Sequence, residues 1–371
     1  MSRSTAIVRS MKFIAVVTAL CLGIAAPLLA QAPAPADSGW NGPHALELIE
    51  RAQMRRSGAI AADTGLVDYQ AEARVFVYFY IDRTDTGQRN LVKTDQLALQ
   101  LFWHAPDEVQ QRIVGWRDEK SLPTNIHYHL DHLTVVMENF ADVIRIGDGD
   151  EVRDVLHPAA PGAANFYDYR LADSLTLRLP GAPEPVRVYE VQVRPKDPSR
   201  PGFVGSIFVD RRAGDIVRMN FTFTSAAYVD PSLDYIDLSL DNGLWQGRYW
   251  LPNEQRVEIR RRIPELDIPA GSVIRATMRV SDYRFNQPLP PGTFVGPRVV
   301  AVPQKQREAF PFEEGIHAEV REEGIGPSVE LADVQRMARE LVRERALQKV
   351  SGLRLGMPSA SDLLRYDRAE G

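Results

Sequence analysis

Apolar and polar residues alternate over the middle of the chain, between residues 202 and 263. Runs rich in β-branched and aromatic residues, Phe203 to Val209 and Ile216 to Phe223, are separated by the polar segment Arg211 to Asp215. A period of two residues with turn residues between the runs is typical of antiparallel strands joined by tight turns. The pattern predicts a β-meander.

Further strands are predicted on both sides of this meander. Within it, Asp241 to Gly243 has turn chemistry, and the proline in Leu251 to Asn253 predicts a break in the strand. An amphipathic helix is predicted before the strands, from Ala45 to Ser57. The other predicted strands are 69–81, 96–104, 109–116, 133–137, 143–146, 167–179, 186–193 and 272–285. Because no crossover helices separate these strands, a parallel α/β fold is excluded. The sequence predicts a mainly β protein with one large antiparallel sheet, curled or closed to protect its edges.

The N-terminus has the features of an export signal. Positive charges precede an apolar run from Phe13 to about Ala26, and small residues follow up to Ala30, where we expect cleavage. Cys21 lies within this signal, so the mature chain is expected to contain no thiol. The exported chain is expected in a bacterial periplasm, and an association with the outer membrane is a further expectation. The predicted segments are a signal peptide (1–30), a Pro/Ala-rich linker (31–43), the β domain (44–287), a proline-rich connector (288–330), and a C-terminal helix with a tail (331–371).

Composition narrows the function classes. The chain has 371 residues, of which 44% are hydrophobic and 25% charged, and its formal net charge is −5. A phosphate-binding surface needs a concentrated excess of Lys and Arg, so no nucleic-acid partner is expected.

Several predicted strands are apolar on both faces. Tyr69 to Ile81 is apolar or amphipathic at nearly every position, which either ordinary packing or a ligand cavity on one face would explain. The second explanation predicts an apolar cavity for a lipid or a lipidated protein, and which sheet face lines it stays open. The candidate lining residues are Phe76, Tyr78, Leu99, Leu101, Trp103, Phe208 and Phe221.

The order of these features resembles a known family. The signal, the early helix, the long antiparallel series and the hairpin from Ile207 to Phe221 (IFVDRRAGDIVRMNF) are similar to the periplasmic carrier superfamily that sorts outer-membrane lipoproteins. The resemblance covers about Ala45 to Phe285. It implies a half-open β-barrel closed by helices, an apolar concavity for acyl chains, and a binding role without catalysis or cofactor.

The C-terminal residues suggest an alternative. Leu364 to Gly371 (LRYDRAEG) resembles the start of an outer-membrane β-barrel in bacterial proteins where a carrier-like domain precedes the barrel, with Asp367 in place of an Asn. The chain would then be a structural or assembly module of a barrel protein, and an outer-membrane barrel would be a partner.

One motif keeps an enzymatic reading open. His127, His129, Asp131 and His132 fit the H-x-H-x-D-H signature of the metallo-β-lactamase superfamily, in which such residues hold zinc and generate a hydroxide nucleophile. That superfamily alternates strands with helices and needs further downstream ligands, whereas here only His157 and His317 follow. A zinc-dependent hydrolase is therefore a second alternative, and a structural role for these histidines is the plainer interpretation.

Overall fold

The computed structural model describes residues 39–59, 65–83, 88–121, 140–146, 152–262 and 270–318. The chain divides into two compact units, Met1–Ala34 and Pro35–Gly371, and every described residue belongs to the second. Within the described residues, no helix has the length and hydropathy needed to cross a lipid bilayer. The predicted signal peptide, the H-x-H-x-D-H motif, the C-terminal helix and the barrel-like tail lie outside the described residues.

Strands make up most of the described chain. The helical elements are α1 (Pro43–Ala59), η3 (Ala163–Asn165), η4 (Ser225–Ala227) and α2 (Gln304–Glu308). The first strands are β1 (Asp68–Arg83), β2 (Gln88–His104), β3 (Glu108–Lys120), β4 (Val143–Ile144), β5 (Val155–Leu156) and β6 (Tyr167–Leu177). They are followed by β7 (Val186–Pro195), β8 (Phe203–Asp210), β9 (Ile216–Phe223), β10 (Leu233–Trp245), β11 (Tyr249–Arg262), β12 (Ala270–Phe285) and β13 (Val299–Ala301).

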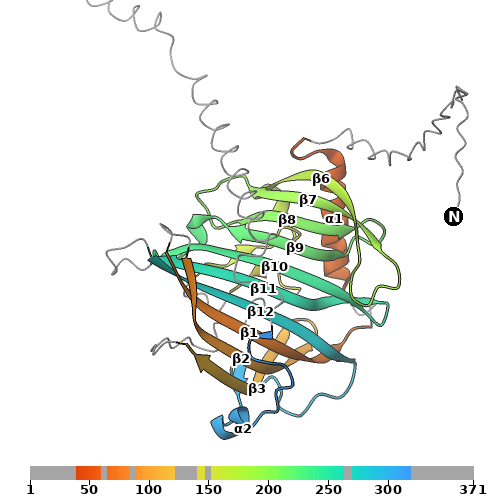
Figure 1. Ribbon diagram of the computed structural model, residues 1–371. Helices are drawn as coiled ribbons and strands as arrows, with labels where there is room; N and C mark the ends of the chain where they lie inside the picture. The colour runs from red at the N-terminus through yellow and green to blue at the C-terminus, as the bar shows by residue number, and fades with distance from the viewer. Residues whose placement is uncertain are drawn as a thin grey trace, which may run out of the picture. The chain divides into compact units, whose positions relative to one another are not determined.

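Eleven of these strands form one sheet in the order β13-β3-β2-β1-β12-β11-β10-β9-β8-β7-β6. Figure 1 shows this order from β3 to β6. All neighbours are antiparallel except β13, which pairs in parallel with β3. Strand β1 pairs with β12, so the first and last long strands meet in the middle of the sheet. The edge strands β13 and β6 are not paired with each other in the described chain, so the sheet stays open. The predicted fold class and the predicted β-meander are confirmed.

The turn predicted at Asp241 to Gly243 is wrong. Strand β10 continues through these residues to Trp245, and the chain reverses at Gln246 and Gly247, with φ values of 50° and 65°. Two successive residues with positive φ match the twist of a hairpin. The break predicted at Leu251 to Asn253 is also wrong, because β11 runs through Pro252. A bulge between Asp241 and Asn242 in the β10–β11 pairing accommodates the proline.

Helix α1 confirms the helix predicted from Ala45 to Ser57. Its apolar residues Ala45, Leu48, Ile49 and Ala52 are buried in the main core. Arg55 near the end of α1 forms an ion pair of 2.7 Å with Asp215 in the turn between β8 and β9. Together with the contact to β6, this places α1 across the strands β6 to β9, as Figure 1 shows.

The two faces of the sheet can be distinguished by alternation along each strand. We call the face whose side chains join α1 in the main core the α1 face, and the other the opposite face. On β1, Val75, Val77 and Phe79 belong to the α1 face, while Phe76 and its alternating partners on β1 form a separate cluster on the opposite face. The apolar character of both faces therefore reflects burial on both sides.

Residues 304–318 of the predicted connector run over the opposite face of β1, β2 and β3. Phe310 lies on Gly115, where a Cβ atom would come within 2.5 Å of the phenyl ring. The guanidinium of Arg74 stacks 5.2 Å from the ring of Phe310, and that of Arg117 stacks 4.8 Å from the ring of Phe312. These contacts cover the opposite face of β1 to β3 with the C-terminal part of the described chain.

Candidate ligand-binding site

The seven predicted lining residues lie on both faces of the sheet. Leu99, Leu101 and Trp103 lie together on the α1 face of β2. Phe221 shares this face on β9, but β1, β12, β11 and β10 separate it from β2. The structure therefore brings three of the seven into one group.

The other three predicted residues lie on the opposite face. Phe76 and Tyr78 cluster with Tyr80 and Val273, and the Tyr78 hydroxyl donates to the carbonyl oxygen of Ile316 at 3.5 Å. Phe208 belongs to another cluster, which contains Leu179, Val188 and Val217. A cavity on the α1 face would thus involve Leu99, Leu101 and Trp103, with Phe221 farther along the same face.

Aromatic side chains gather at one end of the α1 face, where β1 begins and β2 and β12 end. We call this group the aromatic rim. It consists of Tyr69, Trp103, Trp245, Tyr249, Tyr283 and Phe285. The ring of Tyr69 stacks on Trp103 with centroids 5.5 Å apart and meets Tyr283 edge-on at 5.4 Å. The ring of Tyr283 lies 4.6 Å from Trp245 and 5.7 Å from Phe285.

Tyr283 is held in place by its hydroxyl group. The hydroxyl donates to the carbonyl oxygen of Pro252 at 2.8 Å. Burial of the hydroxyl raises the pKa of Tyr283 well above its ordinary value, and Tyr69 acts in the same direction. The phenol therefore stays neutral and acts as a hydrogen-bond donor. Sequence reasoning missed Tyr69, Tyr283 and Phe285, because only the pairing of β1 with β12 brings the two strands together.

A narrow crevice opens on the α1 face beside the aromatic rim. It has a volume of about 20 Å³, and Tyr69, Leu101, Val109, Met278 and Tyr283 are among its lining residues. That volume holds about one water molecule. The buried Oε1 atom of Gln111, which also lines the crevice, has no hydrogen-bond partner. Apolar side chains and the glutamines Gln110, Gln111 and Gln255 line the crevice, which is much smaller than a lipid pocket.

A charged pair lies on the same face at the other end of β2. Lys93 Nζ donates to Asp95 Oδ2 at 2.8 Å, and the ammonium lies 5.3 Å from the ring centroid of Phe79. The side chains of Lys93 and Asp95 are only 7% and 2% exposed, and Asp95 Oδ1 is buried without a hydrogen-bond partner. Burial raises the pKa of the Asp95 carboxyl above its ordinary value, although the hydrogen bond from Lys93 acts against this shift.

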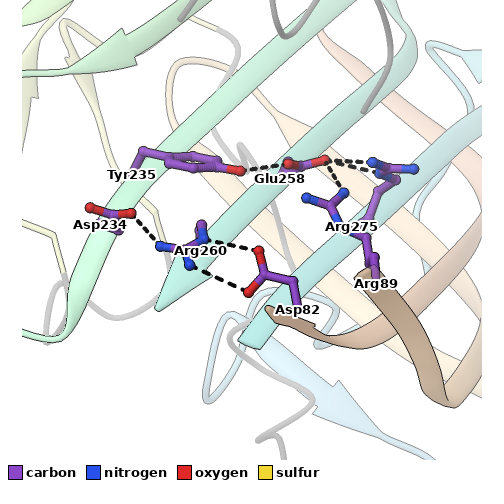
Figure 2. A network of polar contacts seen from close by, with 7 residues as sticks. All are labelled: Asp82, Arg89, Asp234, Tyr235, Glu258, Arg260 and Arg275. Carbon is purple, nitrogen blue, oxygen red and sulfur yellow. Dashed lines mark hydrogen bonds and ion pairs between the residues drawn. The ribbon is translucent and has the colours of Figure 1, made fainter. Parts of the chain in front are cut away.

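The opposite face carries a larger polar network, shown in Figure 2. Glu258 is fully buried and accepts hydrogen bonds from Tyr235 at 2.7 Å and from Arg275 at 2.7 and 3.1 Å. Arg89 adds an ion pair of 3.6 Å to the same carboxylate. The network thus connects β2, β12, β11 and β10.

A second centre of the network lies beside the first. Arg260 bonds to Asp82 on β1, with the shortest contact at 3.1 Å, and also to Asp234 on β10. Each charged group in Figure 2 has a partner of opposite charge, on a neighbouring strand or across one or two strands. Such an arrangement connects the strands of the sheet in their order.

His157 and His317, the two histidines that could complete a zinc site, contact different parts of the chain. His157 is buried, its Nδ1 accepts the Ala159 N–H at 3.0 Å, and burial holds its pKa well below the ordinary value. His317 contacts Thr94 at 3.4 Å and Glu119 at 3.3 Å on the side of the connector. Among the described residues, no group of three His, Cys, Asp or Glu side chains could hold a metal ion. The zinc hypothesis on His127, His129, Asp131 and His132 stays untested, since these four lie outside the described residues.

A larger hollow of about 400 Å³ lies at the ends of β1, β2 and β3. Asp68, His104, Glu108 and the loop 289–295 line it. His104 faces the ring of Phe294 at a centroid distance of 6.2 Å, and Asp68 Oδ1 accepts the backbone N–H of Gln287 at 3.1 Å. The hollow brings together a histidine and two carboxylates, with no hydrogen bond between the three side chains recorded in the described chain.

No protein-family model matches the chain, and no curated protein matches it either. Similar solved structures include the following three. An outer membrane lipoprotein-sorting protein domain from Vibrio parahaemolyticus is 12% identical, covers 68% of this chain and 97% of its own, and has a TM-score of 0.29. A LolA superfamily protein from Nitrosomonas europaea is 13% identical, with coverages of 68% and 97% and a TM-score of 0.22. The MucA/MucB complex of Pseudomonas aeruginosa is 14% identical, with coverages of 64% and 99% and a TM-score of 0.18.

The solved structures to which the chain is similar include lipoprotein-sorting domains. At TM-scores of 0.18 to 0.29, this similarity does not identify a ligand. Any function must follow from the side chains on the sheet.

Proposed function

We propose that this chain binds the acyl chain of a lipid or of a lipidated protein on the α1 face of β1, β2, β3 and β12. The observation that carries the proposal is the continuous row of apolar core side chains Leu97, Leu99, Leu101 and Trp103 on β2, which ends at the crevice beside the aromatic rim. Hydrocarbon contacts need no directional partners, so such a surface suits an acyl chain. The sequence resemblance to lipoprotein carriers is in line with this role.

The binding energy comes from apolar surface removed from water. Burial is worth roughly 25 cal/mol per Å², and the ordering of ligand and protein offsets part of it, so one acyl chain is held by several kcal/mol. The crevice of about 20 Å³ is far below the roughly 300 Å³ or more of typical ligand pockets. Binding therefore requires the lining side chains to move apart, and the cost of that opening lowers the observed affinity.

The predicted export signal provides the compartment of this function. A chain cleaved near Ala30 would meet acylated molecules in the periplasm or at the outer membrane. For this reason the proposal includes a lipidated protein as a partner. It also includes a position near an outer-membrane barrel.

Native mass spectrometry tests the proposal directly. The mature chain is purified from a bacterial periplasm without chelator, so that lipid and metal are read in one spectrum. We expect added mass that matches acyl species. A bare polypeptide mass, even after incubation with a monoacyl lipid, would contradict acyl binding, and one or two zinc ions would favour the hydrolase instead.

A matched pair of variants locates the binding face. Leu101 lines the crevice on the α1 face and Leu177 packs in a cluster on the opposite face, and both side chains are partly exposed. Leu101→Gln introduces a polar amide into the acyl path, so we expect it to lose most of the bound lipid. Leu177→Gln serves as the control and keeps it. Equal lipid content in the two variants would move the site away from the α1 face.

A further inference from the structure

The α1 face of β2 changes in character along its length. Its residues read, in order, Lys93, Asp95, Leu97, Leu99, Leu101 and Trp103. Register confirms the shared face, because Lys93 pairs with Phe79, Asp95 with Val77 and Leu97 with Val75, all three of which are core residues of that face. The strand therefore has a charged end, an aliphatic middle and an aromatic end. This order matches an amphiphile, which has a polar head and an apolar chain.

The dimensions of this strip suit one acyl chain. The seven residues from Asp95 to Leu101 span six steps, or about 20 Å, along a strand that rises about 3.4 Å per residue. A long acyl chain lying along the aliphatic middle would thus place its head beside Lys93 and Asp95 and its end at the crevice. The opposite orientation would put a polar head among the rings of the aromatic rim.

The charged end carries unused hydrogen-bonding capacity. Asp95 Oδ1 is a buried acceptor with no partner, although Lys93 occupies Oδ2. Trp116, whose position on β3 pairs with Leu97, has a buried Nε1 donor that also lacks a partner. An unmet buried polar atom destabilises the fold, and a ligand that supplies the missing partner would recover that loss.

Resting on the proposed function, we propose that Lys93, Asp95 and Trp116 bind the head of the acyl ligand, and that this head is uncharged and bears a hydroxyl or amide donor. The donor group bonds to Asp95 Oδ1, and an ester or amide carbonyl oxygen accepts from Trp116 Nε1. A free carboxylate offers acceptors only and would face the Asp95 oxygen with a like charge. The site therefore selects a glyceride or an acylated amide over a fatty acid.

Three probes with the same C16 chain separate the possible causes of such a preference. These are monopalmitoylglycerol, which has hydroxyl donors, methyl palmitate, which has neither donor nor charge, and palmitate, which has a charge and no donor. Their affinities for the full exported chain are measured by displacement of a fluorescent acyl probe at pH 8, below micellar concentrations. We expect the affinity for monopalmitoylglycerol to be about ten-fold or more above that for palmitate, because a hydrogen bond to a charged group changes affinity by at least this factor.

The double variant Lys93→Met/Asp95→Leu removes both charges together. Replacing a buried ion pair by apolar residues is often neutral for stability, so the fold is expected to survive. The preference for monopalmitoylglycerol should vanish in this variant. The control Arg279→Met/Glu254→Leu acts on the opposite face, where it removes the ion pairs of Glu254 with Arg279 at 3.0 Å and with Arg256 at 2.7 Å. This control should keep the preference.

The outcomes separate this inference from the proposed function. If palmitate binds the wild-type chain as tightly as monopalmitoylglycerol, or if the double variant keeps the preference, the head site is overturned while acyl binding stands. If methyl palmitate equals monopalmitoylglycerol, the donor bond to Asp95 is refuted. If no probe binds, the proposed function itself fails. The comparison of the three probes on the wild-type chain decides the matter even if the double variant does not fold.

Discussion

The two faces of the sheet are both buried, yet different interactions hold them. Around Glu258 on the opposite face, directional bonds connect neighbouring strands, and each charge has a partner of opposite sign. On the α1 face of β2, most contacts are apolar and non-directional, and the Lys93–Asp95 pair at its charged end is the exception. Asp95 Oδ1 at that end, Trp116 Nε1 on β3 and Gln111 Oε1 at the crevice lack hydrogen-bond partners. Side chains that pack without directional bonds can shift to admit a ligand at modest cost. The opposite face therefore holds the strand order, and the α1 face is the better place for binding.

The largest expected effect is on the opposite face. Glu258→Leu leaves Arg275 buried without its carboxylate, and an uncompensated buried charge costs about 3–5 kcal/mol. We expect this loss in the free energy of unfolding measured with urea. Tyr235→Phe, which removes only one hydrogen bond to Glu258, is the control and should lose less. A loss below that of the control would show that the network does not hold the strands.

Two cavity-forming variants, one on each face, test whether a lipid restores stability on the α1 face alone. Leu99→Ala on the α1 face and Leu179→Ala on the opposite face each remove a buried leucine side chain, at a cost of about 2–5 kcal/mol. Adding monopalmitoylglycerol should restore stability to the first variant, because a ligand that binds only the folded state stabilises it. Thermal unfolding with and without lipid gives the answer. Recovery of the Leu179→Ala variant to the same extent would remove the distinction between the faces.

The charged end of the α1 face predicts an unusual dependence on pH. The raised pKa of Asp95 means that the folded state holds this proton more tightly than the unfolded state does. Its contribution to stability is therefore complete below the unfolded pKa, near 4, and is lost as the pH rises through the folded pKa. The Asp95→Asn variant should gain stability relative to wild type over that rise, by an amount smaller than the effects above.

Asp154 serves as a control, because its pKa is shifted in the opposite direction to that of Asp95. The hydrogen bond from Arg145 lowers the pKa of Asp154, so its contribution is present above the unfolded pKa and is lost as the pH falls through the folded pKa. Asp154→Asn should therefore lose stability relative to wild type as the pH rises. Urea denaturation between pH 3 and pH 7 measures both variants, and slopes of the same sign would contradict the assignment.

The smallest effect is expected at a half-exposed ion pair of the opposite face. Arg279 is 43% exposed and lies 3.0 Å from Glu254. Water screens such pairs, so Arg279→Met should change the free energy of unfolding by no more than about 1 kcal/mol. A loss as large as that of Glu258→Leu would show that exposure does not separate the two kinds of pair.

Local patterns predicted the elements well where one signal dominated. The alternation in Phe203 to Val209 and the helical spacing from Ala45 onward both correspond to elements of the structure. The turn after β10 was misplaced because Asn242 and Gly243 carry a stronger turn signal than Gln246 and Gly247, yet the bulge beside Asp241 keeps the strand running.

The candidate site was predicted only in part, for a reason that lies in long-range pairing. Leu99, Leu101 and Trp103 share a face because alternation within one strand decides it. Phe76 and Phe208 were grouped with them because apolar content alone does not tell which face a residue joins. Asp95 and Lys93 lie one and two periods before Leu97 on the same strand, so their shared face could have been predicted from spacing, but their burial could not.

The sequence by itself determined the strand-rich class, the antiparallel meander and the helix before it, because period and turn chemistry act between residues close along the chain. Only the tertiary structure decided that β1 meets β12, that Tyr69 joins Tyr283 at the aromatic rim, and that Glu258 lies at the centre of a buried network. These contacts join residues as far apart as Tyr69 and Phe285. Which distant strands pair depends on how all the strands together bury their apolar faces, and no local pattern contains that choice.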